Sequence, residues 1–285
     1  MFSKKKLKAE ITLMDETYHP EKTLTIEDLP ISVNIEYVGN PSMPKAKIRI
    51  YGVSKEIMDE ITTIQLFEIF VKNRRIRISA DEGDGYQVLF DGGIMNAVPM
   101  YNTAPNVFIQ IESSLFLYQN FENLPPFNVP DTGMSIYSAI SNCCKPFGIQ
   151  VENYMTTTGM AKGGQYDGGL RDRLWALERS CGSCRVTYVS NNIVRLFDKE
   201  NPTATAEYEL TPDNYIGYPN FNSCGIELTL DKIIPIECGD AFTISGSQVG
   251  FANTSWQVFK KQYNLESYMN GKWQMKLWGI YYVKK

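Results

Sequence analysis

Residues 224–282 alternate apolar and polar side chains over several short stretches, and this pattern constrains the fold more than any other feature of the chain. A strand places successive side chains on opposite faces, so period-two runs divided by Gly, Asn and Asp are typical of antiparallel strands joined by turns. Turns are expected at Gly239-Asp240 and Asn270-Gly271. The predicted strands cover residues 226–230, 241–244, 256–263 and 273–282. We expect them to curl into a small β-barrel.

The first 118 residues also read mainly as strands. Between residues 45 and 51, Ala46, Ile48 and Ile50 share one face while three basic residues occupy the other. Ser54 is a good N-cap for a short amphipathic helix that runs to residue 64. The other strands are expected at residues 7–13, 24–26, 31–37, 66–71, 75–80, 86–96 and 107–118. These residues predict a first barrel with one helix.

Residues 119–200 differ in composition and begin with a proline-rich connector. Helices are predicted over 134–145 and 170–181, where the apolar residues have helical spacing; Leu174, Leu177 and Trp175 are expected to point inward. Strands are expected at 149–154, 185–189 and 193–197. The fold class is therefore mainly β with a small α/β module. The predicted domains are a barrel at 1–118, the two-helix α/β module at 119–200 and a second barrel at 201–285.

Three stretches of the chain resemble the late-control protein D family, the baseplate hub proteins of tailed bacteriophages. The first barrel carries the likeness at Tyr51, Gly52, Phe90, Gly92, Gly93, Ile94 and Ala97. The closing barrel carries it in the Gly-Asp turn, the W-x-V beginning at Trp256, the Asn-Gly turn and the W-x-x-x-L beginning at Trp273. The middle module carries a matching run of Leu, Gly and strand residues between 174 and 196. The three stretches follow one another in the order expected of that family.

The resemblance implies a structural virion protein of the tail baseplate, assembled in the host cytoplasm. Such hubs form a homotrimer in which two tube-like barrels per chain make a pseudo-hexameric ring. That ring joins the tail tube to a central spike, contacts other baseplate proteins and lets DNA pass without specific binding. The resemblance implies no catalytic, cofactor-binding or metal-binding residue and no membrane anchor. Whether the tail contracts, which host is used and whether the particle is a phage or a phage-derived machine are left open.

Composition supports a soluble globular chain without a nucleic-acid footprint. The formal net charge is −4 and the pI is about 5.3, whereas a protein that grips phosphate backbones carries a basic surface. No run of about 18 apolar residues is present, so no transmembrane helix is expected. The basic cluster at residues 4–6 has no apolar stretch behind it and is not a secretory signal.

The sequence disfavours two kinds of chemical site. The single histidine, His19, excludes a metal site with two histidines in one chain, and no nucleophile elbow accompanies it. The adjacent pair Cys143-Cys144 and the CxxC at Cys181 and Cys184 would bind zinc or an iron–sulfur cluster if the two helix ends met. Buried free thiols are the favoured interpretation of these residues, and of Cys224 and Cys238.

Two rival functions stay open at this point. A tail-associated cell-wall hydrolase would need two facing carboxylates, and the candidates are Glu152, Asp167, Asp172 and Glu178. A receptor- or glycan-binding tail protein would stack sugars on exposed aromatic side chains, and the candidates are Tyr263, Tyr268 and Trp273. Arg74, Arg75 and Arg77 are interpreted as a solvated or subunit-facing strand edge and not as a nucleic-acid patch.

Overall fold

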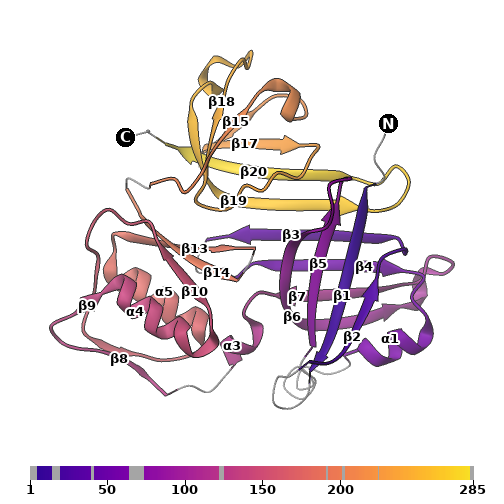
Figure 1. Cartoon of the computed structure of the whole chain (residues 1–285), viewed down its shortest axis with the longest axis horizontal. Helices are drawn as coiled ribbons and strands as arrows, with labels where there is room; N and C mark the ends of the chain where they lie inside the picture. The colour runs from indigo at the N-terminus through magenta and orange to yellow at the C-terminus, as the bar shows by residue number, and fades with distance from the viewer. Residues whose placement is uncertain are drawn as a thin grey trace. The chain divides into compact units, whose positions relative to one another are not determined.

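The structure is a computed structural model that describes residues 5–14, 20–39, 42–63, 74–121, 125–190, 192–200, 203–223 and 225–282. The chain divides into two compact units. Figure 1 labels the helices and strands. Unit 1 contains residues 1–36, 44–118 and 263–274, and unit 2 contains residues 37–43, 119–262 and 275–285. The chain is mainly β with a small helical module, as the sequence predicts. The three-domain division stays a prediction.

Unit 1 is built on one antiparallel sheet in which the strand order is β3-β4-β7-β6-β5-β1-β2. The end of β19 lies beside β3, where the backbone N–H of Ser267 donates to the carbonyl of Ile31 over 2.9 Å. The strands are β1 (Lys6–Met14), β2 (Pro20–Ile26), β3 (Ile31–Val38), β4 (Lys45–Tyr51), β5 (Arg74–Asp81), β6 (Gln87–Met100) and β7 (Phe108–Ser114), and β19 spans Ser255–Glu266.

Alternation decides which face of this sheet is buried. In β4 the residues alternate between exposed and buried, with Ala46, Ile48 and Ile50 in the core, as predicted. The helix α1 (Lys55–Ile61) buries Met58 and Ile61, and Ser54 caps it by accepting from the N–H of Ile57 over 3.4 Å. The predicted strand at residues 66–71 lies outside the described residues.

Two predictions about unit 1 are wrong. Strand β5 is not an edge, because β1 pairs with one side of it and β6 with the other. The strand predicted over 107–118 ends at Ser114, and a one-turn helix, α3 (Leu117–Phe121), begins after the left-handed Phe116. The short 3-10 helix η1 (Tyr101–Thr103) joins β6 to β7.

Unit 2 begins with the α/β module. Helices α4 (Ile136–Cys144) and α5 (Leu170–Cys181) lie where the sequence predicts them, and η2 (Lys145–Phe147) extends α4 to the left-handed Gly148. A three-stranded sheet joins β10 (Gln150–Asn153), β14 (Ile193–Asp198) and β13 (Cys184–Val189) in that order. Two short pairs were not predicted: β8 (Phe127–Val129) with β12 (Gly164–Tyr166), and β9 (Met134–Ser135) with β11 (Met160–Ala161).

The helices bury the faces that their spacing predicts, with one correction. Leu174 and Leu177 of α5 are fully buried, but Trp175 is exposed, and the guanidinium of Arg179 lies 4.8 Å from its ring centroid. Arg173 takes the inward place instead and donates to the carbonyls of Gly168 and Pro125 at 2.9 and 2.8 Å. A long cation can be buried when backbone oxygens satisfy its donors.

The closing part of unit 2 forms a sheet that closes on itself. Its strands are β15 (Glu207–Leu210), β16 (Asn220–Asn222), β17 (Gly225–Leu230), β18 (Ala241–Ile244), the first part of β19 and β20 (Trp273–Tyr281), with the one-turn helices η3 (Pro212–Asn214) and η4 (Gly250–Ala252). The segment 207–222 pairs with β18 at its start and, through the Tyr215–Leu230 bridge and β16, with β17 at its end. This closes the small barrel, although β15 and β18 run parallel and not antiparallel as expected.

In the part of the chain that the structure describes, no helix is both long and apolar enough to cross a membrane.

Candidate functional site

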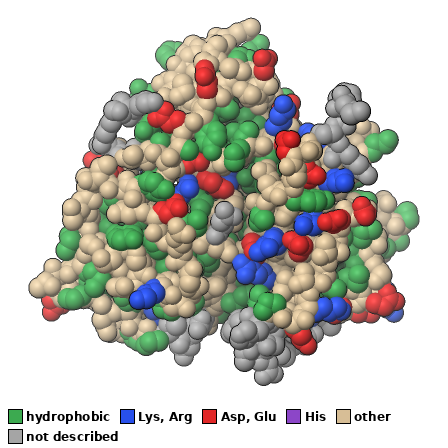
Figure 2. All heavy atoms as spheres, viewed as in Figure 1, with side chains coloured by type: hydrophobic (Ala, Val, Ile, Leu, Met, Phe, Trp, Pro, Cys, Tyr) green, Lys and Arg blue, Asp and Glu red, His purple; other side chains and the backbone are tan. Residues whose placement is uncertain are grey.

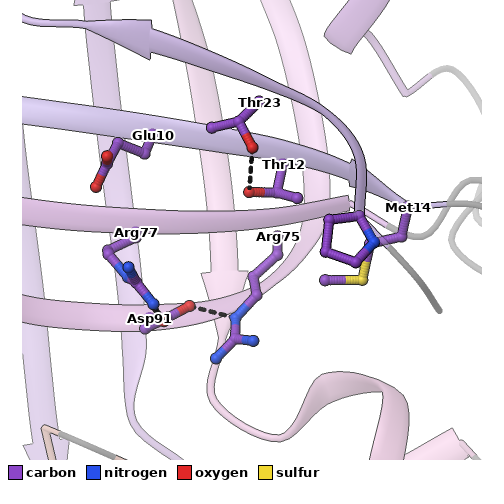
Figure 3. A pocket seen from close by; sticks show the side chains of 8 residues that line it. Glu10, Thr12, Met14, Thr23, Arg75, Arg77 and Asp91 are labelled. Atoms are coloured by element: carbon purple, nitrogen blue, oxygen red, sulfur yellow. Dashed lines mark hydrogen bonds and ion pairs between the residues drawn. The ribbon is translucent and has the colours of Figure 1, made fainter.

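A charged groove lies on the outer face of the unit 1 sheet (Figure 3). It has a volume of about 310 Å³ and draws on strands β1, β2, β5 and β6. Its lining residues are Glu10, Thr12, Met14, Pro20, Thr23, Arg75, Arg77 and Asp91. Figure 2 shows charged side chains of both signs gathered over the strands of unit 1.

Asp91 organises the two arginines of the groove. Its side chain is only 7% exposed, and it accepts from the Nε of Arg75 through Oδ1. The Nε and Nη2 of Arg77 each lie 3.0 Å from its Oδ2. The strand register explains the convergence, because Arg77 is directly opposite Asp91 and Arg75 is opposite Gly93, two residues along β6.

The remaining polar groups complete the floor of the groove. Thr12 and Thr23 are directly opposite one another on β1 and β2, and their hydroxyl oxygens lie 3.3 Å apart. Glu10 forms an ion pair with Lys8 at 3.5 Å. Guanidinium and hydroxyl donors on a rigid sheet can hold an anionic group in place.

Arg74 was grouped with these arginines in the sequence, but the structure places it elsewhere. Its side chain is buried, and Nη1 donates to the carbonyls of Ile61 and Thr62 at 2.7 and 3.0 Å. These are the last residue and the C-cap of α1. Arg74 therefore fixes the helix end to β5 and is not part of the outer surface.

Gly92 and Gly93 lie within strand β6, where neighbouring atoms leave no room for a Cβ. A Cβ at Gly92 would come within 2.7 Å of the ring of Phe90, and one at Gly93 within 2.7 Å of Leu117. Gly85 lies between β5 and β6 with a φ of +104°, a conformation that favours glycine, and its N–H donates to Asp81 over 3.0 Å.

The described cysteines are free thiols. Burial raises the pKa of Cys143 to about 11 and that of Cys144 to about 12, and it raises the pKa of Cys184 well above its usual range. Cys181 is partly exposed and lies beside Ser183 at 3.3 Å. Over the described residues, no three or more Cys, His, Asp and Glu side chains are grouped to hold a metal ion. His19 and Cys224 lie outside those residues, and the absence of a cofactor stays a prediction.

The four candidate carboxylates of a hydrolase each have a local partner. Glu152 accepts from the Nε of Arg195 over 2.8 Å, and the backbone N–H of Val186 donates to Glu178 over 3.4 Å. Asp167 accepts from Gln165 at 3.1 Å, and Asp172 accepts from its neighbour Arg171 at 2.9 Å. Each of the four carboxylates therefore accepts a hydrogen bond from a nearby group.

Two of the three aromatic residues proposed for sugar stacking are in the wrong place. Tyr263 and Trp273 are buried, and the indole N–H of Trp273 donates to Glu82 over 2.7 Å. A buried ring cannot offer its face to a glycan. Tyr268 is exposed and lies edge-on to Tyr51 with ring centroids 6.3 Å apart.

Unit 2 contains a buried lysine that the sequence reading missed. Lys261 is fully buried; its Nζ donates to Glu237 and, over 3.1 Å, to the hydroxyl of Ser190, and it lies 4.7 Å from the ring centroid of Tyr37. Alternation puts Lys261 on the same strand face as Tyr263, two residues further along β19, but a charged side chain on that face gives no sign of burial in the sequence.

Two more features of unit 2 fix the turn before β18 and the end of β14. Gly239 has a φ of +99°, and a Cβ there would overlap the ring of Phe197. Burial opposes ionisation of Asp198, but hydrogen bonds from Thr157 and Thr156 outweigh it and lower the pKa of that carboxyl. The N–H and hydroxyl of Thr156 both lie 2.7 Å from Asp198 Oδ2.

Two solved structures match nearly the whole chain. The tail protein from Neisseria meningitidis MC58 matches with a TM-score of 0.61 at 9% identity, covering 95% of this chain and 96% of that one. The 43 kDa tail protein of prophage MuSo2 from Shewanella oneidensis matches with a TM-score of 0.60 at 10% identity and the same coverage. The chain has a phage tail-related fold.

The fold extends to secretion machines. A component of the E. coli type VI secretion system, described as structurally similar to T4 bacteriophage tail proteins, matches with a TM-score of 0.59 at 6% identity, covering 90% of this chain and 74% of that one. No protein-family model matches the sequence, and no curated protein matches it significantly. The likeness therefore concerns the fold alone.

Proposed function

We propose that this chain is a structural hub protein of a phage tail baseplate or of a related phage-derived particle. The observation that carries the proposal is the match to two tail proteins over 95% of this chain and 96% of theirs. The finer role is the one that the sequence resemblance implies. Three copies form a pseudo-hexameric ring between the tail tube and the central spike, and DNA passes through without specific binding.

An exposed aromatic cluster in unit 2 supports a role in assembly. The ring of Trp256 lies 6.1 Å from that of Phe221 and 6.1 Å from that of Tyr281, both edge-on. Phe221 is 42% exposed and Tyr281 is 64% exposed. Clustered aromatic side chains at the surface are typical of protein–protein interfaces, where they supply much of the binding energy. The role is mechanical, so the chain contributes no catalytic step.

Native mass spectrometry of the purified full chain tests this proposal. The mass is measured over a range of concentrations, alone and after co-expression with the tail tube and spike proteins from the same tail gene cluster. A trimer, alone or bound to the spike, is the expected result. A chain that stays monomeric at every concentration with both partners present contradicts the proposal and favours the receptor-binding and hydrolase alternatives.

A further inference from the structure

We infer that the Arg75–Arg77 groove of unit 1 is a docking site for an aspartate or glutamate side chain of a neighbouring protein subunit. The inference rests on the proposed function for the identity of that neighbour, but not for the chemistry of the groove.

The charges of the groove are separated by depth. The side chain of Arg75 is 38% exposed and that of Arg77 is 50% exposed, whereas Asp91 beneath them is nearly inaccessible. An approaching group therefore meets guanidinium edges first. Because Asp91 already orients both arginines on β5, which pairs on both sides, binding there costs little side-chain entropy.

The balance of charge favours a carboxylate over a phosphate. Two carboxylates, Glu10 and Asp91, accompany the two arginines of the lining, and Lys8 pairs with Glu10. These charges leave a surplus of one cation, which suits a monoanion and not a dianion. A nucleic-acid backbone also needs a continuous basic track, and the chain as a whole is acidic. A single monoanionic carboxylate matches the forked donors of an arginine, and the hydroxyls of Thr12 and Thr23 lie beside it.

The shape favours a side chain carried by a protein over a free small molecule. At about 310 Å³ the groove is at the lower limit of small-molecule pockets, which range over about 300–1,000 Å³ and bury most of their ligand. Met14 and Pro20 form an apolar side that suits the methylene groups of an acidic side chain. A preoriented arginine pair of this kind is a frequent energetic centre of protein interfaces.

Binding to the groove is measured with N-acetyl-glutamate N-methylamide, a neutral-backbone probe of one glutamate side chain. The readout is the Nε–Hε NMR signals of arginine in the full chain, with the glutamine analogue as the uncharged control. We expect saturable shifts of the Arg75 and Arg77 signals with the glutamate probe and none with the glutamine probe. Inorganic phosphate and a duplex DNA oligonucleotide are titrated in parallel, and tighter binding of either one at these signals overturns the inference.

Variants locate the binding. Arg75→Gln/Arg77→Gln is expected to weaken probe binding at least about tenfold, since it removes charge-assisted hydrogen bonds. Adding Asp91→Asn avoids a buried unpaired carboxylate if the double variant folds poorly. Arg49→Gln is the matched control, because Arg49 is exposed on β4 of the same sheet. Equal binding by the control and the double variant overturns the inference.

Assembly provides the second arm of the test. The double variant is compared with the wild-type chain in the native-mass experiment, where it is expected to need at least about tenfold more protein for the same assembly. If the wild-type chain fails to assemble, the proposed function fails. If the wild-type chain assembles and the double variant assembles equally well, the docking inference fails and the proposed function stands.

Discussion

Replacement of Lys261 by methionine is expected to be among the most destabilising single changes in unit 2. Lys261 is fully buried and makes an ion pair with Glu237, whose side chain is 21% exposed. Removing one partner of a buried pair costs about 3–5 kcal/mol, because the other charge stays uncompensated. Since Glu237 retains some contact with water, the lower end applies, and we expect a loss of about 3 kcal/mol.

The assay is urea unfolding followed by tryptophan fluorescence. The free energy of unfolding falls by about 1–3 kcal/mol per molar urea, so a loss of about 3 kcal/mol lowers the urea concentration at the unfolding midpoint by about 1 M or more. Lys260→Met is the matched control: Lys260 lies next in the chain but over the ring of Trp278 at 4.7 Å, a contact worth about 0.5–1 kcal/mol. The double variant Lys261→Met/Glu237→Leu is expected to recover most of the loss. If Lys261→Met costs no more than Lys260→Met, the buried ion pair does not stabilise unit 2 as argued.

Three further changes test other parts of unit 2. Gly239→Ala is expected to lower the free energy of unfolding in urea by about 3 kcal/mol, because the added Cβ overlaps the ring of Phe197 at a left-handed residue. The control Gly250→Ala, which has open space around it, should lower it by less than about 1 kcal/mol. Similar losses in the two variants would contradict this reasoning. Asp198→Asn should lower the free energy of unfolding by about 1–3 kcal/mol at pH 7. Because the folded-state pKa of Asp198 is lowered, its carboxylate contributes its full stabilisation above its unfolded pKa of about 3.8. The difference in unfolding free energy between wild type and Asp198→Asn should therefore shrink as the pH falls below about 4. A difference that stays constant with pH would show that ionised Asp198 is not its cause. Iodoacetamide labelling at pH 8, mapped by mass spectrometry, should modify Cys181 before Cys144, because the raised pKa of buried Cys144 leaves little thiolate. The reverse order would show that burial does not control the reactivity of these thiols.

Local pattern was enough to place most elements of this chain. Helix α5 and strand β18 begin and end at the residues that periodicity indicates, because each buries one face and a buried face leaves its period in the sequence. The short strands β8, β9, β11 and β12 could not be found, since two or three residues are too few to show a period. Their pairing depends on partners up to tens of residues away.

The candidate site was only partly visible in the sequence. Alternation placed Arg75 and Arg77 on one face of a strand, but it could not show that β6 lies beside them and brings Asp91 between them. That convergence arises from register, a property of two strands that neither one encodes alone.

The sequence by itself determined the fold class, the principal helices and strands and the faces that they bury, because these follow from periodicities of a few residues. Only the tertiary structure decided that Trp175 is exposed while Arg173 and Lys261 are buried. Burial of a charged side chain requires oxygens from distant segments to converge on its donors. Hydropathy along one chain contains no record of which segments those are.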